Sequence, residues 1–207
     1  MTGALAPVLR GERVTLRPWE DGDLNVVLSL ASDPLIPLVS EVPNQLGPAS
    51  ARAFIASQRG RCEAGTGWAW AITVGGGPAL GYVGALWTAQ SAGRASIGYW
   101  AHRDSRRSGV TSEAVTAAAT WLLSAGNVAR LEAYIEPGNV GSIRVAERAG
   151  FEREGLMRSF APVNGVRRDA CLYARLPGAQ GQRPALRGRE QPGRVAEVER
   201  HRPGAGE

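Results

Sequence analysis

The residues best suited to chemistry lie in a short turn of arginine and small side chains near the middle of the chain. Arg106, Arg107, Ser108 and Gly109 separate a strand-like segment, 96–101, from a long apolar helical segment. The first amide N–H groups of a helix lack intrahelical acceptors, and the helix dipole favours negative charge beside them. The glycine permits close backbone approach, and the guanidinium groups add positive charge. The turn therefore predicts a site for an anion such as a pyrophosphate, although an ordinary strand-to-helix turn can have a similar sequence.

The elements that must position this turn follow from the spacing of apolar residues. Two-residue alternation predicts strands, and three- to four-residue spacing predicts helices. The result is an α/β (α+β) fold, with a mixed, mostly antiparallel sheet of six to seven strands and about four helices. The expected strands are 10–17, 68–74, 80–88, 95–101, 131–135, 151–157 and 166–176, and the expected helices are 21–31, from 48 onward, 109–123 and 139–149.

Length and composition limit the possible classes of protein. The 207 residues suffice for one domain, which we place at 10–176. Residues 177–207 are rich in Gly, Pro, Arg and Gln, so we expect a disordered tail. The net charge of +5 suits an anionic ligand, but the charge is spread along the chain, which argues against a nucleic-acid binder.

The cysteines and the apolar segments indicate where the protein works. Cys62 and Cys171 have no metal-ligand spacing and predict reduced thiols rather than a disulfide or a metal site. We find no signal peptide and no apolar run long enough to span a membrane. A cytoplasmic protein, monomeric or homodimeric, is the resulting expectation.

Two motifs in this order resemble the GNAT superfamily of N-acetyltransferases. The segment 106–111, Arg-Arg-Ser-Gly-Val-Thr, looks like the acetyl-CoA motif of that superfamily, and a Glu-Ala pair follows at 113–114. Asn139, Ser142 and the Gly-Phe pair at 150–151 resemble its second signature. The segments 14–18 and 97–100 and an Asn-Gly hairpin at 164–165 look like its branch of RimJ/RimL ribosomal-protein-alanine acetyltransferases. The resemblance covers about residues 10–176.

The resemblance implies acetyl transfer from acetyl-CoA to a primary amine by direct attack, without an acyl-enzyme. Ser142 is then the candidate general acid, through a hydrogen bond to the thiolate sulfur; alternatively, its hydroxyl satisfies backbone amides in the first turn of a helix. Asn139 is expected to cap that helix and to contact the pantetheine arm. The implied cofactor-binding residues are Trp100, Ala101, Arg106, Arg107, Ser108, Gly109, Val110, Thr111, Ser112 and Asn139.

Three positions depart from the family pattern. Thr111 replaces a Gly or Ala, and Arg107 stands where many members have Gly. Ser96 stands where the branch often has a Glu that could serve as general base, so a water chain or another side chain would have to take that role. His102 is a candidate base because histidine is a common general base, but its place beside the turn favours an exposed surface histidine.

The identity of the acceptor is left open by the sequence. A protein N-terminal residue and a small-molecule amine both fit, and the loop 34–48 and the hairpin 163–168 are expected to choose between them. A GNAT-fold module that binds acyl-CoA without turnover is the alternative, motivated by Ser96. A nucleic-acid binder is the weakest reading, because it rests on charge and the tail alone.

Overall fold

The computed structural model describes residues 5–33, 46–163 and 165–178. Within these ranges no helix is long and apolar enough to cross a membrane. The expected tail falls almost entirely outside them, as does most of the loop 34–48 and residue 164 of the hairpin. Predictions for those segments therefore remain predictions.

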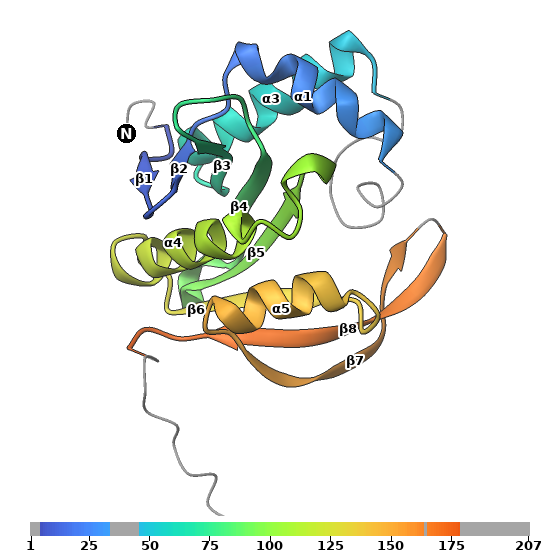
Figure 1. Cartoon of the computed structure of the whole chain (residues 1–207). Helices are drawn as coiled ribbons and strands as arrows, with labels where there is room; N and C mark the ends of the chain where they lie inside the picture. The colour runs from blue at the N-terminus through green and yellow to red at the C-terminus, as the bar shows by residue number, and fades with distance from the viewer. Residues whose placement is uncertain (1–4, 34–45, 164, 179–207) are drawn as a thin grey trace, which may run out of the picture.

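The described segments form an eight-stranded sheet with helices on both faces (Figure 1). The sequence predicted nearly all of these elements, and the additional strand is the two-residue β1. The strands are β1 (Leu9–Arg10), β2 (Val14–Arg17), β3 (Gly67–Val74), β4 (Gly81–Ala89), β5 (Arg94–Ala101), β6 (Arg130–Ile135), β7 (Glu152–Val163) and β8 (Val166–Arg175). The helices are α1 (Leu24–Ser29), α3 (Pro48–Glu63), α4 (Val110–Ser124) and α5 (Val140–Arg148), with short 3-10 turns beside α1 and β5.

The sheet has the strand order β1-β2-β3-β4-β5-β6-β8-β7. Every neighbouring pair is antiparallel except β5 and β6, which run parallel. A parallel pair needs a long crossover connection, and α4 provides it between these two strands. The mixed, mostly antiparallel sheet expected from the sequence is confirmed.

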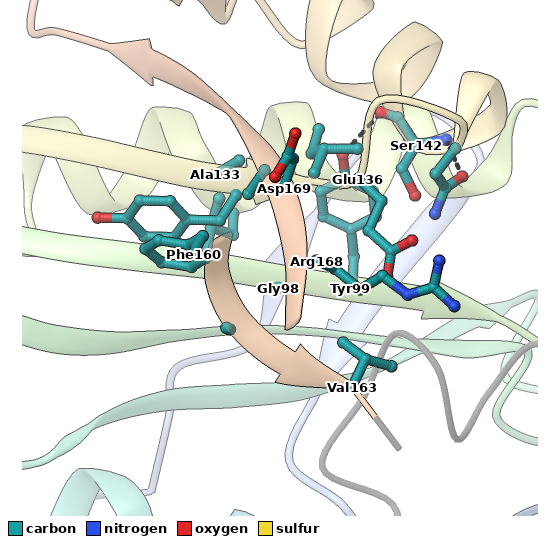
Figure 2. Close-up of a pocket in the computed structure, with 15 residues that line it drawn as sticks. Gly98, Tyr99, Ala133, Glu136, Ser142, Phe160, Val163, Arg168 and Asp169 are labelled. Atoms are coloured by element: carbon teal, nitrogen blue, oxygen red, sulfur yellow. Dashed lines mark hydrogen bonds between the residues drawn. The ribbon is translucent and has the colours of Figure 1, made fainter. Parts of the chain in front are cut away.

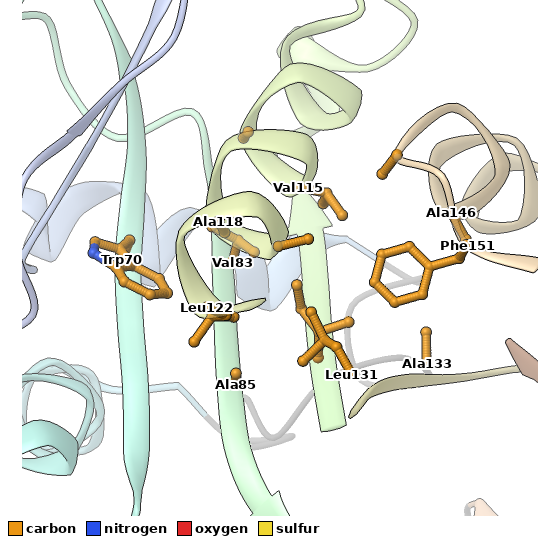
Figure 3. Close-up of a cluster of buried hydrophobic side chains, with 14 of the residues drawn as sticks. Trp70, Val83, Ala85, Val115, Ala118, Leu122, Leu131, Ala133, Ala146 and Phe151 are labelled. Carbon is orange, nitrogen blue, oxygen red and sulfur yellow. The ribbon is translucent and has the colours of Figure 1, made fainter. Parts of the chain in front are cut away.

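Alternation along β3 divides the interior into two cores. Trp70 and Ile72 face one side of the sheet and join the core beneath α4, whereas Ala69 and Ala71 face the other side and pack under α1 and α3. Successive side chains of a strand point to opposite faces, which gives each core its own half of the strand. Figure 3 shows the α4 core, where the labelled Val115, Ala118 and Leu122 lie over the sheet and Phe151 closes the side toward α5.

The first turn of helix α4 is held by a contact with the start of β2 and the turn before it. The Glu113 carboxylate accepts hydrogen bonds from the amides of Arg13 and Val14, at 2.6 and 3.2 Å, and pairs with the Arg13 guanidinium. Desolvation tends to raise the pKa of Glu113, but these hydrogen bonds outweigh it and the pKa is lowered. The Glu of the Glu-Ala pair therefore ties the helix, and the turn before it, to β2.

Candidate active site

The site begins where β5 and β6 separate. The two strands pair over only three positions, from Arg94 opposite Arg130 to Ser96 opposite Glu132. Beyond that point β5 continues to Ala101 in register with β4, and β6 continues to Ile135 in register with β8. The facing sides of 97–101 and 133–135 thus have backbone groups without strand partners, in the middle of the sheet.

A buried carboxylate holds the closed end of this split. Glu132 is 1% exposed and accepts hydrogen bonds from Arg94 of β5, from Arg130 at 2.7 Å and from the Tyr134 hydroxyl at 2.7 Å. Desolvation would raise the pKa of Glu132, but the three donors outweigh it and the pKa is lowered. The carboxylate is therefore ionised, and it joins the two strands just before they separate.

The predicted anion turn follows β5 and has the backbone shape of a nest. Arg107 and Gly109 both have positive φ, 62° and 84°, and such alternation points successive amides toward one side. Ser105 fixes the turn from below, since its hydroxyl donates to the Leu80 carbonyl at 2.7 Å. Val110 starts α4, so the amides of its first turn face outward from the same place. Positive φ explains why many family members have Gly where this chain has Arg107.

The two arginines of the turn have different surroundings. Arg106 pairs with the Asp33 carboxylate, which is 3% exposed, and its Nε donates to the Ala101 carbonyl at 3.2 Å. Arg107 is exposed and forms no side-chain hydrogen bond or ion pair with any described residue. Arg106 thus shapes the turn and links it to the end of the first helical segment, and Arg107 keeps its charge available to a ligand.

The same helical segment covers His102. The His102 Nε2 lies 3.1 Å from the Ser29 hydroxyl, and its side chain is 19% exposed. The expectation of an exposed surface histidine is therefore wrong, because α1 and the 3-10 turn after it pack against the turn. Arg103 adds a neighbouring contact, donating to the Ser32 carbonyl at 3.3 Å.

A cavity of about 600 Å³ lies between this turn, the end of β5 and the start of α5, within the range of about 300–1,000 Å³ common for ligand sites. Trp100, Ala101, Arg106, Arg107, Thr111 and Asn139, all predicted from the sequence, line it. The indole of Trp100 stacks on Tyr82 at 6.0 Å in the α3 core, so Trp100 offers mainly its backbone. Four other predicted residues, Ser108, Gly109, Val110 and Ser112, lie in the turn and the first helical turn but do not line the cavity.

The start of α5 places Ser142 against β5. Asn139 caps the helix, its Oδ1 accepting from the Ser142 amide at 3.0 Å, as the sequence predicted. The Tyr99 hydroxyl donates to the Ser142 carbonyl at 2.8 Å, and burial raises the pKa of Tyr99 far above its ordinary value. The Ser142 hydroxyl itself has no partner among the described residues, so it does not cap the backbone and is free for another group.

A second cavity, of about 210 Å³, adjoins the first and lies between β5, β6 and the β7–β8 hairpin. Figure 2 shows this cavity with Glu136 and Ser142 toward one end and Phe160 at the other. Phe160 stacks on Tyr134 with ring centroids 4.7 Å apart. Four residues line both cavities: Tyr99, Glu136, Asn139 and Ser142.

A bulge in β7 brings Phe160 to this cavity. Pairing of β7 with β8 shifts between Met157 and Ala161, and Ser159 has a φ of 53°. The Ser159 amide donates to Asp169 at 2.8 Å, and Arg167 donates to the Ser159 hydroxyl at 2.8 Å and carbonyl at 3.0 Å. A bulge bends a strand and redirects a side chain, which here is Phe160.

Sequence reasoning missed Glu136 and Phe160. Glu136 stands three residues before the motif Asn139, where its position after a strand was a usable signal. Nothing in the sequence distinguishes Phe160, since the bulge depends on partners across the hairpin. Ser96, the position of the missing Glu, lines a third cavity of about 170 Å³ beneath α3 and neither of the two described above.

Comparison with known proteins settles the family. The chain matches the acetyltransferase (GNAT) domain family over residues 13–152. This chain belongs to the GNAT family. It is an N-acetyltransferase of that family. The N-acetyltransferase p20 of Bacillus licheniformis, itself uncharacterized, is 30% identical over 166 residues, which cover 80% of this chain and 93% of p20.

Solved structures share the fold at lower identity. RimL, a ribosomal L7/L12 α-N-protein acetyltransferase solved with coenzyme A, superposes with a TM-score of 0.75 at 20% identity, covering 84% of this chain and 99% of that one. Mycobacterium smegmatis RimJ, solved with a CoA-disulfide, gives a TM-score of 0.75 at 23% identity, covering 87% and 90%. The family match confirms the GNAT resemblance deduced from the sequence motifs, and these structures confirm the fold.

Proposed function

We propose that this GNAT enzyme acetylates a primary amine, either a protein N-terminal residue or a small-molecule amine, by direct attack. The observation that carries the proposal is the meeting of two cavities at Tyr99, Glu136, Asn139 and Ser142. The larger cavity reaches the turn at 106–109, and the smaller one reaches the β7–β8 hairpin. An acyl donor and an acceptor could thus approach the same point from two sides.

The residues around the larger cavity fit acetyl-CoA. The nest at 107–109 and the first amides of α4 suit a pyrophosphate, with the Arg107 guanidinium beside them. The unpaired edge of β5 offers peptide groups that match the amides of a pantetheine arm, and Asn139 lies at the same wall. When bound, acetyl-CoA supplies an activated thioester.

The chain's own groups then assist the transfer. A backbone N–H on the unpaired side of 97–101 is positioned to stabilise negative charge developing on the acyl oxygen. The Ser142 hydroxyl is positioned to donate a hydrogen bond to the departing sulfur, since Asn139 and Tyr99 hold its backbone from both sides. Removal of the Ser142 hydroxyl should slow acetyl transfer without weakening the binding of acetyl-CoA.

The test combines cofactor binding with thiol release. Purified protein should bind acetyl-CoA in calorimetry and release free CoA with at least one amine from a panel of peptides with varied N-termini, polyamines and aminoglycosides. Ser142→Ala should lower the rate at least tenfold while the dissociation constant for acetyl-CoA stays within about twofold. If the protein binds acetyl-CoA but releases free CoA with none of the amines, it is instead an acyl-CoA-binding module. The serine at position 96 motivates that alternative.

A further inference from the structure

We propose that Glu136 takes over the proton-accepting role for the acceptor amine, a role that rests on the proposed acetyl transfer. An amine at neutral pH is mostly protonated, because the ordinary pKa of an α-amino group is about 7.7–8.0 and that of a lysine side chain is higher. The ammonium must lose a proton before its nitrogen can attack. The Ser96 side chain has no carboxylate to take up this proton, so the general base must be another residue of the site.

Glu136 stands at the junction between the two cavities. It directly follows the last residue of β6, on the side where β6 has separated from β5. Its carbonyl accepts from the Asn139 amide at 2.9 Å, which fixes it relative to the start of α5. Among the four residues that line both cavities, Glu136 alone has a carboxylate. It therefore faces both the acyl-donor side and the acceptor side.

The other candidate bases are engaged or misplaced. Glu132 is buried and bound by three donors at the closed end of the split. Asp169 lines the smaller cavity alone and accepts the Ser159 amide. Tyr99 donates its hydroxyl to the Ser142 carbonyl. His102 lines neither cavity and is covered by α1.

The carboxylate of Glu136 is free to receive a ligand. It forms no ion pair or side-chain hydrogen bond with any residue in the described ranges. The charged groups that share the smaller cavity with it are Arg168 and Asp169, and those that share the larger one are Arg106 and Arg107. With Glu136 counted, the smaller cavity is lined by two carboxylates and the one guanidinium of Arg168, and this net negative charge favours a protonated amine.

The proposed transfer conserves every proton. The ammonium gives one proton to the Glu136 carboxylate, directly or through one water, and becomes a neutral amine. Its nitrogen forms a bond to the acyl carbon as the carbon–sulfur bond breaks. The nitrogen then loses a second proton, and the thiolate sulfur gains one with the help of the Ser142 hydroxyl. The products are an amide and the free thiol of CoA. Glu136 then returns its proton to solvent.

The decisive variant is Glu136→Gln, which keeps the shape and removes the proton acceptor. For the panel amine with the highest wild-type rate, we expect kcat/KM to fall about 10²- to 10⁴-fold, with acetyl-CoA binding unchanged within about twofold. The residual rate should rise about tenfold per pH unit below the amine pKa, because the variant depends on amine already neutral in solution. The wild-type rate should change much less over the same range. Glu136→Asp should recover part of the loss.

A matched control and the possible outcomes separate this inference from the proposed function. Glu147→Gln changes an exposed glutamate on α5 and should leave every parameter unaltered. If Glu136→Gln keeps the wild-type rate, or shows the same pH slope as the wild type at a reduced rate, Glu136 is not the base and acetyl transfer still stands. If the wild-type protein binds no acetyl-CoA or acetylates no amine, the proposed function fails, and the role of Glu136 fails with it.

Discussion

The two cavities that meet at Ser142 are walled in different ways. The larger one is bounded by a backbone nest, a helix N-terminus and the unpaired edge of β5, whereas the smaller one is bounded by side chains of four strands, with Phe160 and Tyr134 stacked at one end. Backbone groups bind a phosphate or an amide whatever side chains surround them. Side chains read the shape and charge of a particular molecule. One wall can therefore stay constant while the other changes with the acceptor.

The largest expected effect concerns the Glu132 carboxylate, which holds the closed end of the split between β5 and β6. Glu132→Gln removes the charge that holds Arg94 and Arg130 at the closed end of the split, and we expect a loss of about 3 kcal/mol in the free energy of unfolding at pH 7. Urea denaturation measures it. Glu152→Gln, on an exposed position of β7, is the control and should cost less than about 0.5 kcal/mol.

The pH dependence gives this prediction a sign. The folded-state pKa of Glu132 lies below its unfolded value of about 4.3. Its contribution to stability is thus complete above that value and is lost as the pH falls through the folded pKa. Wild type and Glu132→Gln should differ most at neutral pH and converge as the pH falls below about 4. A difference that is equally large in acid would contradict an ionic role.

A backbone change in the turn beside the larger cavity should have the next largest effect. Gly109 has a φ of 84°, and an added Cβ would lie 3.1 Å from the Arg13 guanidinium. Gly109→Ala should cost roughly 1–2 kcal/mol in stability or in acetyl-CoA affinity, because a side chain is strained in this conformation. Calorimetry and thermal melts together measure both parts. Gly155→Ala, where a Cβ meets nothing within 4 Å, should change neither.

Phe160 offers the corresponding test in the smaller cavity. Phe160→Ala removes the stack on Tyr134, and aromatic pairs contribute about 0.5–1.5 kcal/mol. The change also removes the Phe160 ring from the cavity wall, so the acceptor KM should rise about threefold to tenfold, as expected for the loss of about 1 kcal/mol of apolar contact, while acetyl-CoA affinity stays the same. A drop in cofactor affinity of equal size would show that the two walls are not independent.

The smallest effect is expected at an exposed side chain of the larger cavity. Arg107→Ala should weaken acetyl-CoA binding only about threefold, because an exposed ion pair contributes up to about 1 kcal/mol. Arg107→Gly should remove the same charge but relieve the positive φ, so its melting temperature should exceed that of Arg107→Ala. If Arg107→Ala abolishes cofactor binding, side chains rather than backbone dominate the larger cavity.

The same contrast explains what the sequence could predict. The turn at 106–109, the Asn139 cap and the strands and helices depend on neighbouring residues, and local spacing revealed them. The pairing of Arg106 with Asp33 joins residues 73 positions apart, so the sequence suggested a free phosphate ligand where the structure has a tied side chain. The split after Ser96 and the bulge at Ser159 likewise depend on partners in other strands.

The three-residue pairing of β5 with β6 has a consequence for the empty and loaded enzyme. Two strand edges with unpaired peptide groups face each other inside the sheet. Amide hydrogens on such an edge exchange readily with solvent, and the edge can pair with a strand of another molecule. A bound pantetheine arm would occupy that gap much as a missing strand would. Hydrogen exchange along 97–101 should accordingly slow on addition of acetyl-CoA, and the empty enzyme should be the form more prone to aggregate.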